Sequence, residues 1–170
     1  MRFSKHCSPI LVLALLLAPP ALTARANRGP STPEERAKAL ELVRVLETAP
    51  ASAEAKEARQ WLTLWLTEIP DLTIKVCLSL LGAKDETAGL PGELSMQHAY
   101  SSAAYLIGHP NTNPGSTEVL LAGVQGTLRA YEAWKAADPA MSQPLLEALL
   151  QKERSGTLEQ HVGQQGRHCR

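Results

Sequence analysis

The chain has 170 residues, 44% of them hydrophobic, and equal numbers of basic (17) and acidic (17) side chains. This length suffices for one folded domain with its own core, which needs neither a metal ion nor a second chain for stability. The basic side chains form no cluster that would indicate binding to nucleic acid or to an anionic lipid surface. We therefore expect no nucleic-acid partner.

The first 26 residues have the pattern of a cleavable signal peptide. Arg2 and Lys5 precede an uninterrupted run of nine apolar residues, Ile10 to Ala18. A helix of that length covers only about 14 Å, whereas the hydrocarbon core of a bilayer is roughly 30 Å thick, so the run is too short to span a membrane. The alternative, a buried N-terminal helix, would place two basic side chains beside an apolar run that has no polar face.

Small residues follow this run at the spacing that a signal peptidase accepts. The best match is Ala24-Arg25-Ala26, which predicts cleavage between Ala26 and Asn27. Cleavage would remove three of the 17 basic side chains and none of the 17 acidic ones, so the mature chain would carry a net charge near −3. We expect an exported protein, periplasmic or secreted, with no stable membrane insertion after cleavage.

Two cysteines, Cys77 and Cys169, remain after this cleavage, because Cys7 lies in the leader. Disulfides persist in compartments outside the cytoplasm, so an even number of cysteines in an exported chain favours a bridge. The bridge would tie a C-terminal tail, residues 163–170, to a helical domain of residues 27–162. The alternative is a buried Cys77 that acts as a small hydrophobic residue, with a free Cys169 in a frayed end.

Aliphatic side chains recur at spacings of three and four through the rest of the chain, as in amphipathic helices. Proline, glycine and capping residues divide this pattern into predicted helices that begin at residues 33, 53, 72, 93, 117 and 143, with a short final turn after Thr157. Short connections imply antiparallel neighbours. The predicted fold is all-α: a single compact domain of about six helices in antiparallel hairpins, either a bundle or a short α-α stack.

Side chains suited to helix N-caps precede most of these segments. Thr32 and Glu35 form the pattern of a capping box, in which each side chain accepts a hydrogen bond from the backbone of the other. Further N-caps are predicted at Ser52, Asp71, Ser142 and Thr157.

The segment from Leu72 to Leu81 is ambiguous. Its apolar residues alternate as in a strand, yet Ile74, Cys77 and Leu78 also fit one face of a helix. An isolated strand would leave its backbone groups unpaired, and no other stretch of the chain has a convincing β pattern. The sequence therefore favours a helix here, and one that is buried, because Lys75 is its only charged residue.

Two later segments carry residues that favour close helix packing. Small side chains surround the apolar face of the helix predicted to start at residue 93, and Gly123 and Gly126 interrupt the helix predicted to start at residue 117. A glycine inside a helix costs up to about 1 kcal/mol relative to alanine, so it usually marks a tight helix contact. Arg129 is expected to be solvated or to pair with Glu118 or Glu132.

Sequence patterns typical of catalytic, cofactor or metal sites are absent, so we predict no catalytic residue, no cofactor and no metal site. His98 could act as an acid or base, but no nucleophile or carboxylate accompanies it, and a surface or hydrogen-bonded structural histidine is favoured. His161, His168 and Cys169 could form a metal cluster, but their spacing is not that of standard ligands, and a metal would compete with the disulfide.

The aromatic residues give the better indication of function. After the leader the chain has no Phe but keeps three Trp and three Tyr, which combine an apolar ring with a polar group and are enriched at protein interfaces. Trp61 lies beside the main apolar stripe of its helix whereas Trp65 lies on it, so Trp61 is either partly exposed or part of a wide buried stripe. The predicted binding surface comprises Trp61, Tyr105 and Trp134.

These observations predict an exported helical protein that acts by binding another protein, in the cell envelope or outside the cell. Two alternatives stay open. One is an inhibitor or immunity-type partner protein, by analogy with other small exported helical proteins. The other is a small hydrolase whose carboxylates and His98 come together only in three dimensions.

Overall fold

A computed structural model describes residues 28–81 and 90–169. The predicted leader, with its cleavage site between Ala26 and Asn27, lies outside this range. Within it the chain forms six α-helices and two short 3-10 helices, and no strand. The all-α fold predicted from the sequence is confirmed. No helix in these ranges is both long enough and apolar enough to cross a bilayer.

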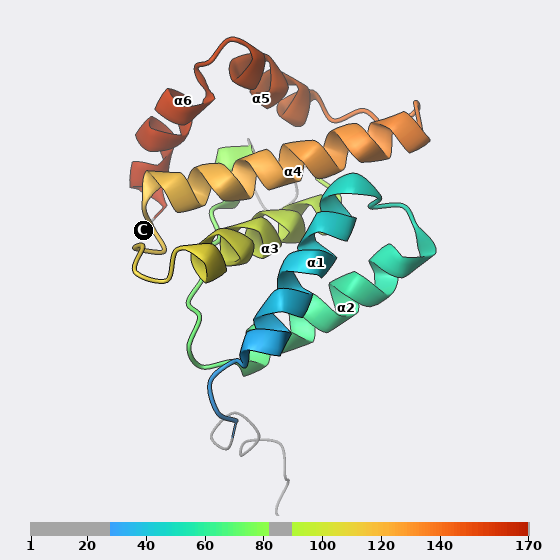
Figure 1. Ribbon diagram of the computed structural model, residues 1–170. Helices are drawn as coiled ribbons and strands as arrows, with labels where there is room; N and C mark the ends of the chain where they lie inside the picture. Colours follow the sequence, from blue (N-terminus) through green and yellow to red (C-terminus); the bar gives the residue numbers. More distant parts are fainter. Residues whose placement is uncertain (1–27, 82–89, 170) are drawn as a thin grey trace, which may run out of the picture.

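The helices form two hairpins and a C-terminal cap (Figure 1). In Figure 1 the first hairpin pairs α1 with α2, the second pairs α3 with α4, and α5 and α6 cover the far side of α4. A 3-10 helix, η2, lies between the hairpins in sequence, and another, η3, follows α6. The bounds are α1 Pro33–Thr48, α2 Ala53–Glu68, η2 Leu78–Leu81, α3 Gly92–Gly108, α4 Thr117–Ala137, α5 Pro144–Arg154, α6 Leu158–Gln165 and η3 Gly166–His168.

The first hairpin begins as its sequence predicts. Thr32 and Glu35 form the capping box, and the Ser52 hydroxyl accepts a hydrogen bond from the backbone N–H of Ala55. Each cap satisfies a backbone donor that the first turn of a helix leaves without an internal acceptor. The guanidinium of Arg59 donates to the carbonyl of Pro50, 3.0 Å away, and so closes the turn between α1 and α2.

The prediction of a buried helix from Leu72 to Leu81 is wrong. Residues 72–77 form neither helix nor strand, only residues 78–81 form a 3-10 turn, and the Val76 side chain is 51% exposed. The segment links the end of α2 to the edge of the second hairpin (Figure 1). Figure 1 draws this segment as an open trace, and a helix over the same residues would cover only about 1.5 Å per residue, less than half the length of extended backbone.

Asp71 holds the N-terminal segment in place and does not act as the predicted cap. Its carboxylate accepts hydrogen bonds from the backbone N–H of Ser31 (2.8 Å), the Ser31 hydroxyl (2.8 Å) and the Arg36 guanidinium (2.7 Å). Burial by itself would raise the pKa of Asp71, but these hydrogen bonds outweigh it and lower the pKa to about 2. The carboxylate therefore stays charged and bound to Ser31 and Arg36 at any pH well above that value.

At two more predicted caps the side chain does not cap the helix, although Thr157 does occupy the N-cap position of α6. Gln143, not Ser142, is the N-cap of α5, and Pro144 occupies the first helical position. The Thr157 hydroxyl contacts the carbonyl of Lys152 in the preceding helix and not the first turn of α6. Pro144 at the first helical position makes the preceding residue, Gln143, the cap of α5, and the hydrogen bond to Lys152 occupies the Thr157 hydroxyl.

The core has two parts, separated by α3. One lies among α4, α5, α6 and η2, and includes Leu128, Tyr131 and Leu146. The other lies within the first hairpin and includes Leu46, Leu62 and the Tyr100 ring from α3. The residues named for the two parts all belong to the described ranges 28–81 and 90–169.

α3 and α4 pack closely because two glycines leave room for the side chains of α3. A Cβ atom built on Gly126 would lie 1.9 Å from the Ser101 hydroxyl, and one built on Gly123 would lie 2.4 Å from the Ser102 hydroxyl. Both distances are far below van der Waals contact, so any larger residue would separate the helices. The tight packing predicted from these glycines is confirmed.

Candidate functional site

The three aromatic residues predicted to form a binding surface lie on three different helices. Trp61 is on α2, Tyr105 on α3 and Trp134 on α4, and each is half-buried. Trp61 and Tyr105 line two separate grooves, and Trp134 packs against the core beneath α5. The structure therefore separates these residues, and Trp61 has the most exposed apolar surroundings.

Trp61 lies in a groove between the helices of the first hairpin, which we call the α1–α2 groove. Its volume is about 410 Å³. Its apolar residues include Leu64, whose side chain is 54% exposed. The residues that line it are Lys38 and Leu42 from α1, and Glu54, Glu57, Ala58, Gln60, Trp61 and Leu64 from α2.

The Trp61 ring makes two contacts that orient it. It stacks on the buried Trp65 ring with 5.4 Å between centroids and 15° between planes. The Lys38 ammonium lies over the Trp61 ring, 4.5 Å from its centroid, in a cation–π contact. A rigid, half-buried aromatic ring gives a large contact area at a low cost in conformational entropy, which suits it as an interface anchor.

The sequence identified Trp61 but missed its neighbours in the groove. Lys38 and Leu64 lie off the buried stripes of their helices, Leu42 lies at the edge of its stripe and packs against the core, and nothing in the local pattern links α1 to this side of α2. One residue in the sequence did indicate the groove: Leu64 is a large apolar residue that lies outside the stripe formed by Ala58, Leu62 and Trp65.

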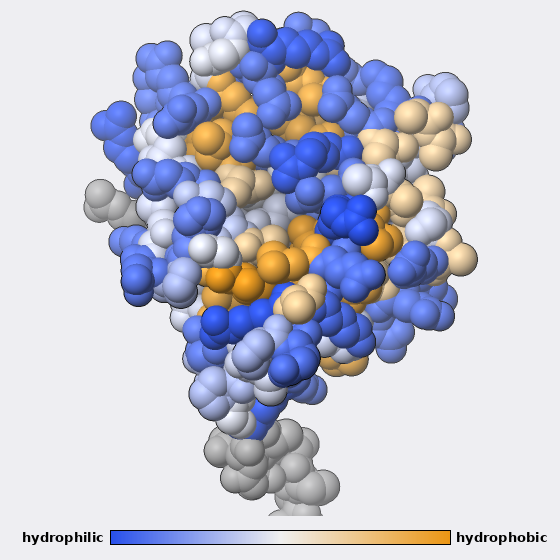
Figure 2. All heavy atoms as spheres, in the orientation of Figure 1, coloured by the Kyte–Doolittle hydropathy of each residue, from blue (hydrophilic) through white to orange (hydrophobic). Residues whose placement is uncertain are grey.

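Tyr105 borders a second, smaller groove of about 210 Å³, where α1 meets α3 and α4. Figure 2 shows an apolar band across this part of the surface. Glu47 lies at one end and accepts hydrogen bonds from the Ser101 hydroxyl (2.7 Å) and from Arg129 Nε (2.9 Å) and Nη2 (3.0 Å).

Arg129 is exposed, as expected, but the ion-pair partners predicted for it are wrong. Its partner is Glu47, and not Glu118 or Glu132; Glu132 pairs instead with Arg154. Arg129 and Glu47 are 82 residues apart in sequence, so local spacing could not reveal the pair. Because the pair bridges the two hairpins and also binds Ser101, we assign this network to holding the hairpins together.

His98 lies inside the contact between α3 and α4 and is fully buried. Neither ring nitrogen has a hydrogen-bond partner among the described residues. Burial disfavours the charged ring and lowers the pKa of His98 to about 4. The expectation of a surface or hydrogen-bonded histidine is wrong, because Gly123 lets the ring pack directly against the backbone of α4.

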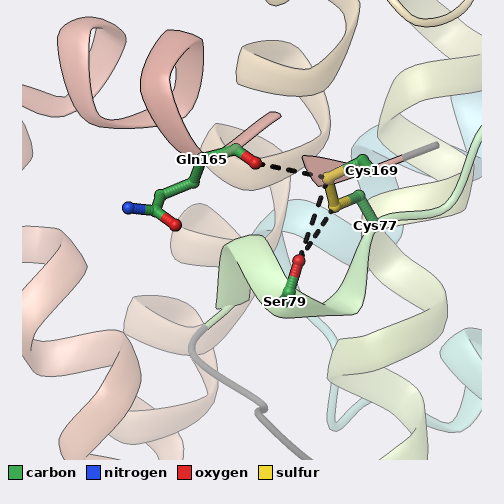
Figure 3. The surroundings of a disulfide bond; sticks show 4 residues. All are labelled: Cys77, Ser79, Gln165 and Cys169. Atoms are coloured by element: carbon green, nitrogen blue, oxygen red, sulfur yellow. Dashed lines mark hydrogen bonds between the residues drawn. A yellow bond between two sulfur atoms is a disulfide. The ribbon is translucent and has the colours of Figure 1, made fainter. Parts of the chain in front are cut away.

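A disulfide joins Cys77 to Cys169, with 5.6 Å between the two Cα atoms (Figure 3). The Ser79 hydroxyl lies 3.2 Å from the Cys77 sulfur. Ser79 belongs to η2, and Cys77 directly precedes that helix. The predicted bridge is confirmed, and it removes Cys169 as a metal ligand beside His161 and His168. In residues 28–81 and 90–169, no group of three His, Cys, Asp or Glu side chains could hold a metal ion.

Comparison with known proteins found no relative of this chain. No protein-family model, no curated protein and no solved structure matches this chain. Among the described residues, Leu64 is the most exposed of the large apolar side chains, and the α1–α2 groove combines it with Trp61.

Proposed function

We propose that this protein is exported and acts by binding another protein through the α1–α2 groove. The observation that supports the proposal is the pairing of a rigid, half-buried Trp61 with the 54% exposed Leu64 beside it. Apolar groups that gather in a groove with a charged rim are typical of protein interaction sites. Export is supported by the sequence of the leader and is consistent with the disulfide.

The hydrolase alternative gains no support from His98. A general acid or base must reach its substrate directly or through one water molecule. His98 is fully buried between two helices and lines neither of the two grooves described above. The carboxylates of the α1–α2 groove, Glu54 and Glu57, have no histidine beside them in its lining.

Affinity capture from an envelope extract or from conditioned medium would test the function. The bait is the oxidised chain without residues 1–26, and the test variant is Leu64→Glu, which places a charge in the groove. Leu145→Glu is the matched control, because Leu145 is a leucine of α5 with a 36% exposed side chain. We expect a protein that the parent chain and Leu145→Glu both capture at similar yield and that Leu64→Glu captures at least fivefold less well.

Equal capture by all three baits would show that the groove is not the binding site. Failure of every bait to enrich any protein from either source would contradict the proposed function itself. Circular dichroism of each variant establishes that the bait is folded, so that loss of capture reports on the surface.

A further inference from the structure

The α1–α2 groove has features that define the chemistry of its partner. The groove runs between the antiparallel helices α1 and α2. Along α2 its lining residues extend from Glu54 to Leu64, about 15 Å at 1.5 Å per residue. An extended peptide binds most readily by adding to a sheet edge, and residues 28–81 and 90–169 contain no strand. A helix instead fits a groove between two helices, because its side-chain ridges enter the groove.

The apolar residues lie where such a helix would need them. Leu42, Ala58 and Trp61 line the groove, and Leu64 follows one turn after Trp61. Apolar side chains at positions i, i+3 or i+4 and i+7 of a docked helix would cover this strip. Trp61 would then be the central anchor, surrounded by residues that exclude water.

The charges of the groove are not balanced along its length. Glu54 and Glu57 lie at one end, exposed, and neither forms an ion pair with any described residue. Among the described residues, Lys38 is the only basic one that lines the groove, and its ammonium lies over the Trp61 ring. The end formed by the first two turns of α2 is therefore acidic, and the groove as a whole carries a net negative charge.

We infer that the partner presents an amphipathic helix with an apolar stripe and with Lys or Arg side chains at the end that meets Glu54 and Glu57. This inference rests on the proposed function and names the partner's chemistry. Opposite charges at the rim of an interface set the orientation and favour the right partner. An acidic helix in the same groove would place like charges together and bind more weakly.

Selection from a displayed library of helical peptides tests this inference. The library carries random residues on one face of a 16-residue helix, and the target is the oxidised chain without residues 1–26. Peptides are counter-selected against Trp61→Ala and, because Trp61 also supports Trp65, against the surface variant Leu64→Glu. We expect the surviving peptides to have apolar residues at helical spacing and Lys or Arg at one end.

A charge-reversal pair then tests the acidic end. Glu57→Lys should weaken binding of the selected basic peptides about fivefold, as expected for an exposed ion pair that becomes a repulsion. Glu159→Lys is the matched control, since Glu159 is exposed on α6 and the net charge changes by the same amount; its affinity should equal that of the parent chain.

Two results would overturn the inferred chemistry and leave the proposed function standing. In the first, the peptides that depend on the groove have no basic end. In the second, they bind Glu57→Lys and the parent chain with equal affinity. If no selected peptide depends on Trp61 or Leu64, a helical partner is excluded, and affinity capture decides separately whether the groove binds a protein at all.

Discussion

At the scale of single residues, the structure depends on polar groups that the sequence marks only weakly. Glu47 joins Ser101 to Arg129 across the two hairpins, although 82 residues separate the two members of the ion pair. Asp71 binds Ser31 and Arg36, where its position suggested a helix cap. The sequence singled out Arg129 and Asp71, but the partners of both depend on the tertiary fold.

His98 should make the stability of the protein depend on pH. Its pKa is about 4 in the folded state and near 6.5 when exposed. Below pH 6.5 the unfolded state therefore binds a proton that the folded state does not, and the free energy of unfolding falls as the pH drops toward 4. The shift corresponds to a loss of roughly 3 kcal/mol between pH 7 and pH 4.

Urea unfolding at pH 7, 5.5 and 4 checks this prediction. The variant His98→Leu removes the titrating group, so its free energy of unfolding should fall less than that of the parent chain over the same range, by roughly the same 3 kcal/mol. Parallel curves for the two proteins would show that His98 takes up a proton without unfolding the chain.

At the scale of helices and turns, the sequence was informative where structure is local. The capping box at Thr32 and the N-cap at Ser52 involve residues three apart, and both form as predicted. The segment 72–77 forms neither helix nor strand, although its apolar spacing fits both. The partial exposure of Trp61, which the sequence left open, depends on how α1 lies against α2.

The contact between α3 and α4 should not tolerate a methyl group. Gly126→Ala would place Cβ 1.9 Å from the Ser101 hydroxyl and 2.6 Å from a Glu47 oxygen, so the helices must separate. The gain of up to about 1 kcal/mol in helix propensity is smaller than the cost of overpacking, about 1 to 3 kcal/mol. We expect a lower melting temperature for this variant.

Gly108→Ala serves as its control. Gly108 is also helical, but no heavy atom lies within 4 Å of a Cβ built there. Thermal unfolding followed by circular dichroism should show this variant equal to or slightly more stable than the parent chain. Equal melting temperatures for Gly126→Ala and the parent chain would mean that the contact is looser than the structure indicates.

At the scale of the whole molecule, the sequence predicted the helical class and the bridge between Cys77 and Cys169. The spacing of apolar residues at three and four predicts the all-α class. Only two cysteines follow the leader, so only one disulfide pairing is possible. The candidate site was only partly predictable. Trp61 could be named, but the groove arises from two helices whose relative rotation no local pattern fixes.

The disulfide should be a major source of stability. It closes a loop of 92 residues, for which the loss of chain entropy in the unfolded state gives about 4 to 5 kcal/mol. Replacing both cysteines by serine should lower the free energy of unfolding by up to that amount, measured in urea without reductant. A reductant should then destabilise the parent chain and leave the double variant unchanged.

The leader prediction can be checked on the exported protein. Mass spectrometry of protein recovered from outside the cytoplasm should give an N-terminus at Asn27 and a mass that shows the two remaining cysteines oxidised. Recovery of the uncleaved chain, or an N-terminus far from Asn27, would contradict the signal-peptide interpretation.

The bridge also divides the molecule by covalent topology. Residues 77–169 form a closed ring that contains α3 to α6, whereas α1 and α2 form an arm that leaves the ring at one point. A protease cut within the ring leaves its pieces joined, but a cut between α2 and Cys77 frees the arm, which then stays in place only through noncovalent contacts with α3 and α4. Because the arm carries the α1–α2 groove, proteolysis in the segment 72–76 would separate the proposed binding site from the most durable part of the protein.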